Sequence, residues 1–314
     1  MKAEQNLNPE MFQPDAKEQQ DAEKIKRPTI KYWPDVWRRL RQNHLAMVGL
    51  GLIIFMGLMS FLGPYLSGYS YFEQELTLRN IDPGSEFWFG TDELGRDLFT
   101  RVWYGARYSL AIGIIAAFID FLIGVSYGGL SGMASRRIDS VMMRIAEVIY
   151  SIPYLLIVIL LSVVLASDSG GSSMFVLILA MSLTGWVPMA ILVRGQVLQL
   201  KESEYSLASE SLGATNGWIL KKHIFPNTLG PILVNVTLTI PRAIFAEATL
   251  GFLGLGLQAP KSSLGTLAND GLAGLAVGNA YQIIIPALLI SLIMFSFNVL
   301  GDGLRDALDP RLRK

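Results

Sequence analysis

Four charged side chains lie within or beside the most apolar stretches of the chain, and they are the residues whose chemistry most needs an explanation. They are Asp120, Glu147, Arg242 and Glu247. A charged group in hydrocarbon is costly unless it faces protein or water. Each of them therefore either lines a polar pathway for a zwitterionic solute or forms hydrogen bonds between packed helices. We favour helix packing, or a place near the membrane edge, for each of the four.

The sequence offers no constellation for catalysis or metal binding. It contains no cysteine and only two histidines, His44 and His223, which are far apart, so thiolate and histidine metal sites are not expected. The one Lys followed by Ser, Lys261, comes after Pro260, whereas a Walker nucleotide loop needs Gly there. Basic and acidic residues are equal at 26 each, which points to no nucleic-acid partner. We predict no catalytic residue, no metal and no cofactor on this chain.

Residues 205–227 form a polar segment between two very apolar ones. Residues 205–212 suit a short helix, and Gly213 suits its C-terminal turn, where a positive φ costs glycine little. The stretch 218–222 suits a second, amphipathic helix, and Pro226 is expected to block its continuation. A contact surface for another protein and a helix lying flat on the membrane both fit this pattern.

Six apolar segments are long enough to cross a bilayer. Of the 314 residues, 51% are hydrophobic and 17% are charged, against about 25% charged in soluble domains. The predicted spans are residues 45–67, 106–130, 142–166, 174–194, 230–251 and 282–302. Proline interrupts the last four spans and is expected to bend them; these residues are Pro153, Pro188, Pro241 and Pro286. The sequence thus predicts an all-α integral membrane protein.

The distribution of basic residues predicts the orientation of the spans. Lys and Arg gather before the first span, between the second and third, between the fourth and fifth, and at the C-terminus. Cytoplasmic loops carry an excess of Lys and Arg, so both termini and the 205–227 segment are predicted to be cytoplasmic. Residues 1–30 are rich in Gln, Glu, Lys and Pro, a composition typical of disorder.

The acidic connection between the first two spans is predicted to lie outside the cell. Leu94, Leu98 and Val102 recur every four residues, which favours an amphipathic helix over residues 92–105 on the outer membrane surface. Asp92 and Arg96 are spaced to pair on that helix. An interfacial anchor is a simpler interpretation of it than a solute contact.

The second span carries small residues at steps of four. Gly124, Gly128 and Gly132 continue a stripe that includes Ala116 and Asp120. Small side chains at this spacing let another helix approach closely, so we expect a crossing neighbour along this stripe.

The 205–227 segment resembles the cytoplasmic coupling motif of ABC importer permeases. That motif reads Glu-Ala-Ala, three residues, Gly, nine residues, Ile, one residue, Leu-Pro, and Ala208, Gly213 and Pro226 stand at the matching positions. The departures are Leu207 for the Glu, Ser209 for the second Ala, His223 for the Ile and Phe225 for the Leu. Because Leu207 is not acidic, no specific ion pair to an ATPase is implied there; Glu210 is the acidic residue that could substitute.

Three further stretches resemble the C-type permease subunit of oligopeptide and dipeptide importers. They begin at Phe89-Gly-Thr-Asp-Glu-Leu-Gly-Arg-Asp, at Glu247-Ala-Thr-Leu-Gly-Phe-Leu-Gly and at Asn298-Val-Leu-Gly-Asp-Gly-Leu-Arg-Asp. With the coupling motif they cover roughly residues 87–312 in the order of the family. Four such motifs in order are far more specific than any one alone.

The resemblance implies a type I ABC permease fold in the cytoplasmic membrane of a prokaryote. It implies a tail over 1–44, a first span over 45–67, an extracytoplasmic loop with an interfacial helix over 68–105, a core over 106–302 with the coupling segment 201–227, and a cytoplasmic tail over 303–314. The implied partners are a homologous permease, two cytoplasmic ATPase subunits that bind the ATP, an extracytoplasmic solute-binding protein and membrane lipid.

The implied function is ATP-driven import of oligopeptides or dipeptides. Relatives of such permeases also carry nickel chelates or haem, so these solutes stay open. A stand-alone ion-coupled carrier would show inverted repeats, and the sequence has no convincing internal repeat. A membrane anchor that transports nothing is a further alternative, which four family motifs disfavour.

Overall fold

The computed structural model describes residues 32–165 and 174–309, and the regular structure in these ranges is helical. The predicted disorder of residues 1–30 concerns residues outside them. The elements are α2 (Tyr32–Gln42), α3 (His44–Leu66), η2 (Leu76–Leu78), α4 (Leu98–Met133), α5 (Arg136–Ser151), α6 (Tyr154–Leu165), α7 (Met174–Lys201), α8 (Glu204–Ser211), α9 (Asn216–Ile219), η3 (Leu220–Ile224), α10 (Phe225–Phe252), α11 (Leu264–Ala276) and α12 (Tyr281–Leu308).

Five helical runs among the described residues are long and apolar enough to cross a membrane. They are α3, α4, α7, the run Asn216–Phe252 that contains α10, and α12. Each contains most or all of one predicted span: 45–67, 106–130, 174–194, 230–251 and 282–302. The all-α membrane architecture is therefore confirmed.

The third predicted span, 142–166, is not one straight helix. The structure divides it into α5 and α6, which meet at a bend of 76° and count as a sixth span only when taken together. Pro153 lies at the bend, between the two helices. Proline disfavours a helical conformation of the residue before it and has no N–H for a helical hydrogen bond, which gives the bend at Pro153 a local cause. Pro188, Pro241 and Pro286, by contrast, lie inside the continuous helices α7, α10 and α12.

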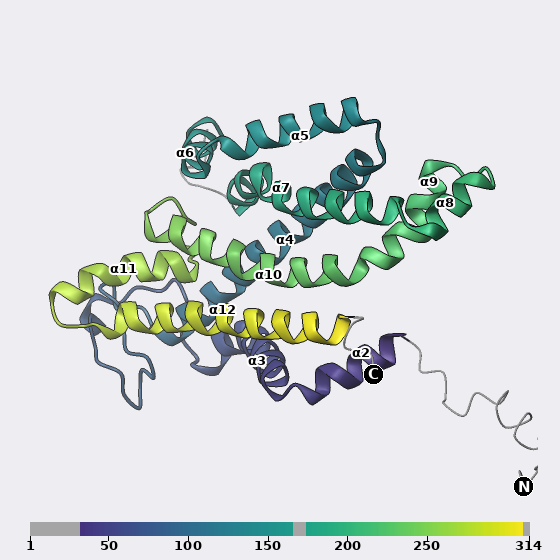
Figure 1. Cartoon of the computed structure of the whole chain (residues 1–314). Helices are drawn as coiled ribbons and strands as arrows, with labels where there is room; N and C mark the ends of the chain where they lie inside the picture. Colours follow the sequence, from purple (N-terminus) through teal and green to yellow (C-terminus); the bar gives the residue numbers. More distant parts are fainter. Residues whose placement is uncertain (1–31, 166–173, 310–314) are drawn as a thin grey trace, which may run out of the picture.

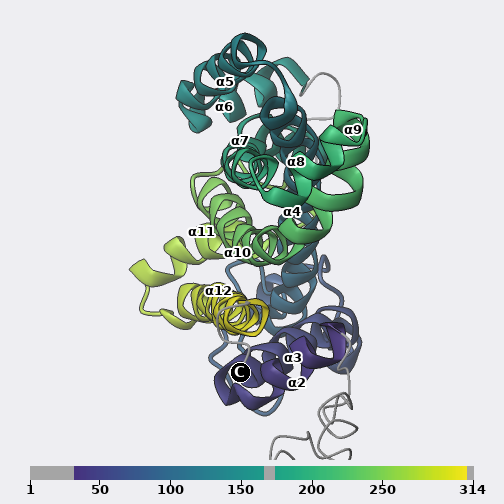
Figure 2. The same cartoon turned by 45° about the vertical axis from the view of Figure 1, so that its right-hand side comes forward.

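The long helices are stacked side by side, as Figures 1 and 2 show, with α5 and α6 at one edge and α2 and α3 at the opposite edge. In Figure 1 α8 and α9 lie at the right-hand end of the stack and α11 at the left-hand end. The start of α2 and the end of α12 lie at the same end of the molecule as α8 (Figure 1). There, a Cβ on Gly230 near the start of α10 would lie within 4 Å of both Leu308 and the Tyr32 hydroxyl.

The small-residue stripe of α4 packs against α7, as its spacing predicts. A Cβ on Gly124 would lie 2.6 Å from the Met189 Cβ, and one on Gly132 would lie 2.7 Å from the Val197 Cβ. At Gly128 the close neighbour is the backbone of Ala190, whose carbonyl carbon would lie 3.0 Å from an added Cβ. Helices in lipid associate largely through such close packing, so this stripe determines how α4 and α7 cross.

Residues 92–97 do not form the first part of an amphipathic helix, which corrects the prediction for 92–105. The helix begins only at Leu98, with Asp97 as its N-cap, and continues as α4. Asp92 and Arg96 do pair, at 2.7 Å between the Asp92 Oδ2 and the Arg96 Nε, but in a buried turn and not on a surface helix.

The Asp92 carboxylate also accepts from the buried Arg101 guanidinium, which reaches Asp270 of α11 at 3.2 Å. Burial of these charges is tolerable because each cation has a carboxylate beside it. This cluster joins the turn before α4 to α11, at the left-hand end of Figure 1.

Residues 264–276 are helical, although the sequence analysis places no element there. Helix α11 starts with a capping box in which Ser263 and Thr266 satisfy each other's backbone N–H groups. Its glycines allow close contact with α12, since a Cβ on Gly271 would lie 2.6 Å from the Gln282 carbonyl oxygen. The helix is too short to span a bilayer, so its sequence lacks the long apolar run that predicts a span.

The α4–α7 packing leads to a stability prediction. Replacing Gly128 with Ala places a methyl group against the α7 backbone and is expected to cost about 1–3 kcal/mol, seen as a lower unfolding midpoint in detergent. The matched control is Gly51→Ala in α3, where an added Cβ meets nothing within 4 Å, and there alanine should be neutral or stabilising. Equal midpoints for the two variants would contradict the close approach of α4 and α7.

Candidate functional site

The coupling segment, residues 201–227, begins with the predicted short helix and its glycine turn. Helix α8 ends at Ser211, and Gly213 has a φ of 87°. The Ala214 N–H donates to the Ser209 carbonyl at 3.0 Å and the Gly213 N–H to the Glu210 carbonyl at 2.9 Å. This hydrogen-bond pattern is a Schellman motif, so Gly213 holds a conformation that other residues adopt only with strain.

Pro226 does not end the second helix of the segment, contrary to the prediction. Helix α9 continues through the π-helical turn η3 directly into α10. Pro226 stands in the first turn of α10, where its missing N–H is tolerated. The wider turn is closed by a hydrogen bond from the Phe225 N–H to the Leu220 carbonyl. The second half of the segment and the fifth span therefore form one continuous helix.

His223 joins the two halves of the coupling segment. Its Nε2 lies 3.3 Å from the Ser209 hydroxyl of α8. Its ring packs edge-on against Trp218 of α9, with 5.0 Å between centroids, and tilted against Tyr205 of α8, at 5.8 Å. A histidine where the coupling motif has an aliphatic residue therefore holds α8 and the α9–η3 turn together.

Buried contacts fix the segment to the ends of the spans. Ile219 and Ile224 are buried in one apolar cluster with Met133 of α4 and Val197 of α7. On the α8 side the Ser206 hydroxyl donates to the Leu200 carbonyl at 2.8 Å. Displacement of the segment would disrupt this packing, and packed interiors resist gradual deformation. The segment and the ends of α4, α7 and α10 should therefore move as one body.

The outward side of the segment is apolar and open. Leu212 at the tip is 89% exposed, and Leu207 and Trp218 are half exposed. A surface hollow of about 430 Å³ is lined by Ser209, Leu212, Gly213, Ala214, Thr215 and Trp218. Ala208 and Glu210 are also exposed. An apolar surface with a hollow is typical of a protein contact site.

An ion pair joins α4, α5 and α7 near the end of α7 from which the coupling segment continues. Arg194 of α7 binds Asp139 of α5 through two hydrogen bonds, Nε to Oδ1 and Nη2 to Oδ2, each 2.6 Å long. The Ser131 hydroxyl of α4 also donates to Asp139 at 2.6 Å. The carboxylate thus joins three helices beside the last turns of α7. Two-pronged Arg–carboxylate pairs are geometrically specific as well as strong.

The four charged residues predicted for the spans do not form one cluster. Asp120 and Arg242 line a common cavity of about 220 Å³ between α4, α5, α6, α7 and α10. Glu247 is 0% exposed and accepts a hydrogen bond from the Ser109 hydroxyl at 2.7 Å. Glu147 is exposed on α5 and pairs with Arg144 at 3.0 Å. The geometry of Glu247 suits helix packing, and that of Glu147 suits a surface position.

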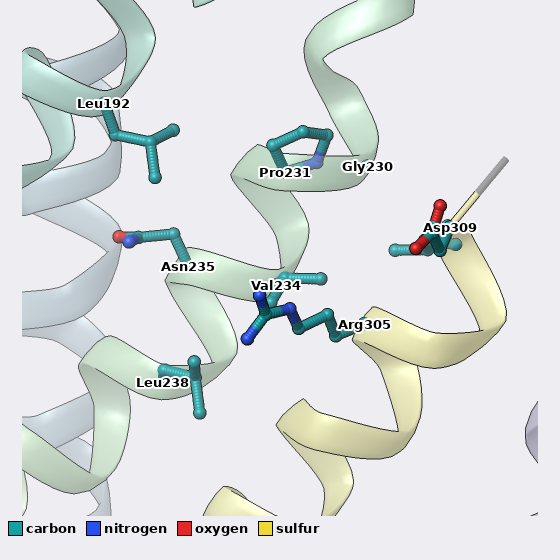
Figure 3. Close-up of a pocket in the computed structure, with 9 residues that line it drawn as sticks. Leu192, Gly230, Pro231, Val234, Asn235, Leu238, Arg305 and Asp309 are labelled. Atoms are coloured by element: carbon teal, nitrogen blue, oxygen red, sulfur yellow. The ribbon is translucent and has the colours of Figure 1, made fainter. Parts of the chain in front are cut away.

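Another cavity, of about 380 Å³, lies between α7, α10 and α12. Figure 3 shows Arg305 of α12 reaching toward Val234 and Asn235 of α10, with Leu238 below them. The remaining lining is mostly apolar, and the cavity lies at the same end of the molecule as the coupling segment.

Within residues 32–165 and 174–309 there is no group of three or more potential His, Cys, Asp or Glu metal ligands. Sequence reasoning missed the Asp139–Arg194 pair and the contact of Arg101 with Asp270. The two members of these pairs are 55 and 169 residues apart, and no local spacing signals a contact over such a separation.

Comparison with known proteins places the chain among transport components. Residues 109–314 match the family described as binding-protein-dependent transport system inner membrane component, and residues 31–83 match the N-terminal TM domain of oligopeptide transport permease C. The dipeptide transport system permease protein DppC of Bacillus subtilis is 53% identical over 305 residues, which is 97% of this chain and 94% of that protein. The oligopeptide transport system permease protein OppC of the same organism is 51% identical over 310 residues, 99% and 100% of the two chains.

A solved structure shares the fold. It is that of the MetNI methionine ABC transporter in inward-facing conformations, with a TM-score of 0.55 and 21% identity over 65% of this chain and 94% of that one. At this identity the likeness concerns the arrangement of the helices alone.

The Asp139–Arg194 pair leads to a second stability prediction. Asp139→Asn leaves the guanidinium without its counter-charge and should lower the free energy of unfolding by about 1–3 kcal/mol. The control is Glu147→Gln, which breaks an exposed pair worth at most about 1 kcal/mol. Thermal unfolding of both variants in detergent measures the difference, and a larger loss for Glu147→Gln would refute the assignment of Asp139.

Proposed function

The chain belongs to the family of inner membrane components of binding-protein-dependent transport systems, in the branch of C-type oligopeptide and dipeptide permeases, and from this we propose how it moves its solute. It is a permease subunit of an ABC importer and not an enzyme. Peptides are its cargo, since the relatives that match nearly its whole length are named as dipeptide and oligopeptide permeases. A nickel chelate, haem or an ion-coupled mechanism has no comparable support.

The coupling segment is the part of this chain on which the ATPase subunits act. The observation that carries this proposal is the combination of an open apolar tip with a buried base. Leu212 is exposed, whereas Ile219 and Ile224 are packed against the ends of α4 and α7. A partner that binds the tip can displace the spans because the packing between them is continuous. Closure of the ATPases on their ATP would thus turn the helices around the solute path.

The remaining subunits are proposed from the family to which the chain belongs. A second, homologous permease would complete the pathway, and two ATPase subunits would bind ATP and the coupling segments. A solute-binding protein would deliver peptide at the opposite end, where α11 and the turn 92–97 lie. Both termini are proposed to be cytoplasmic. The proposal is supported by the start of α2 and the end of α12, which lie at the same end of the molecule as α8 in Figure 1.

Gly213 provides the most direct mutational test of the coupling segment. Valine is strongly disfavoured at positive φ, at a cost of about 1–2 kcal/mol, so Gly213→Val should change the angle between α8 and α9. Peptide uptake in cells should be abolished while the protein still reaches the membrane. The control is Gly217→Val in α9, where an added Cβ also meets nothing within 4 Å but no positive φ is required. Normal uptake by Gly213→Val, with ATPase binding intact, would remove Gly213 from the mechanism.

The function itself is tested by reconstitution. Proteoliposomes that contain this chain, the second permease and both ATPases, supplied with solute-binding protein, should accumulate dipeptide only when ATP is present. Omitting either ATPase should reduce accumulation to background. Accumulation by this chain alone, driven by a proton or sodium gradient, would instead establish an ion-coupled carrier.

A further inference from the structure

One cavity in the span region contains charges that the coupling mechanism leaves unexplained. It has a volume of about 220 Å³ and is lined by residues of α4, α5, α6, α7 and α10, among them Asp120, Tyr154, Thr184 and Arg242. Pockets that enclose a whole drug-sized molecule measure about 300–1,000 Å³. This one is smaller and suits a dipeptide or one end of a longer peptide.

Asp120 is the most deeply buried charge of this cavity. Its side chain is on α4 and the residue is only 5% exposed, yet its Oδ1 has no hydrogen-bond partner among residues 32–165 and 174–309. The carboxyl lies against the backbone of α7, because a Cβ on Gly185 would be 2.8 Å from the Asp120 Cγ. A glycine at position 185 thus leaves room for the carboxyl. An ionisable group at this depth in a membrane protein that lacks a partner is by default a functional group.

The groups beside Asp120 are hydrogen-bond acceptors of the kind that an ammonium group requires. The Tyr154 hydroxyl is buried and also has no hydrogen-bond partner in the part of the chain that the structure describes. Thr184 lines the same cavity, and Pro188 lacks the N–H that would otherwise bond to the Thr184 carbonyl. An ammonium group donates three hydrogen bonds and accepts none. Asp120, Tyr154 and Thr184 together offer both the acceptors and the negative charge that it needs.

Arg242 provides the opposite charge. It lines the cavity from α10, is exposed, and forms no ion pair with any residue that the structure describes. A guanidinium presents two parallel N–H donors that match a carboxylate. A ligand with an ammonium at one end and a carboxylate at the other would satisfy both charges, whereas a simple cation or anion would meet repulsion from one of them.

We propose that this cavity is a transient binding site for zwitterionic peptide in the membrane, with Asp120 holding the peptide ammonium and Arg242 its carboxylate. The inference rests on the proposed function, since it names a binding site for the transported peptide within the membrane. It also assigns Asp120 a role beyond the helix packing that its sequence position favours.

The test uses three probes that differ only in their end groups: alanyl-alanine, its N-acetyl derivative and its C-terminal amide. Each is titrated by ligand-observed NMR onto the purified complex of both permeases and both ATPases in nanodiscs, without solute-binding protein. The unmodified dipeptide should bind about 10-fold more tightly than either derivative, because each derivative loses one charge-assisted interaction.

Two substitutions then give opposite patterns. Asp120→Asn should weaken the binding of alanyl-alanine and of its amide about 10-fold, and leave the N-acetyl derivative unchanged. Arg242→Gln should weaken alanyl-alanine and the N-acetyl derivative and leave the amide unchanged. Glu147→Gln, on the exposed face of α5, is the control and should change none of the three. Should Asp120→Asn fail to assemble, Tyr154→Phe removes a single hydroxyl and should weaken only the two probes with a free amine, about 3-fold.

Equal losses for all three probes, or no loss in either variant, would overturn the inference and leave Asp120 as a packing residue. The same complex is assayed for ATP-driven uptake with its solute-binding protein. Normal uptake combined with a flat binding pattern rejects the zwitterion site alone. If the unsubstituted complex neither binds nor imports peptide, both this inference and the proposed function fail.

Discussion

The close approach of α4 and α7 is the constraint on which the rest of this molecule depends. Three glycines of α4 face α7 so closely that a single methyl group would collide with its side chains or backbone. In lipid there is little hydrophobic drive between helices, so contact at this distance is what fixes one helix on the other. The Asp120 carboxyl lies on the same side of α4, against Gly185 of α7. Farther along α7, Arg194 forms the ion pair with Asp139.

This contact line connects the two regions with a functional interpretation. At one end of this line lies the cavity that contains Asp120, and at the other end lies the apolar cluster that holds Ile219 and Ile224 of the coupling segment. A rotation applied at α8 and α9 would therefore reach the cavity through packed backbone and not through a flexible loop. Such tightly packed elements tend to switch between discrete arrangements, which is what alternating access requires.

Much of the fold follows from local sequence patterns, and the exceptions have physical causes. Gly213 and the α4 stripe were predicted correctly, because positive φ and close helix contact each demand small residues. The prediction that Pro226 ends a helix is wrong, because a proline that stops one helix can equally stand in the first turn of the next. The π turn before it has no sequence signal. The ion pair of Arg101 with Asp270 depends on how α11 folds back onto α4, which local patterns do not encode.

Crosslinking to the ATPase tests most directly whether the coupling segment binds that subunit. The chain contains no cysteine, so a single Leu212→Cys provides a unique thiol at the exposed tip of the coupling segment. Val277→Cys provides one at the end of α11, where the side chain is 64% exposed. In the intact assembly a short thiol-to-amine crosslinker should join Cys at position 212 to an ATPase subunit, and Cys at position 277 should give no such product. An ATPase crosslink at 277 and none at 212 would contradict the account.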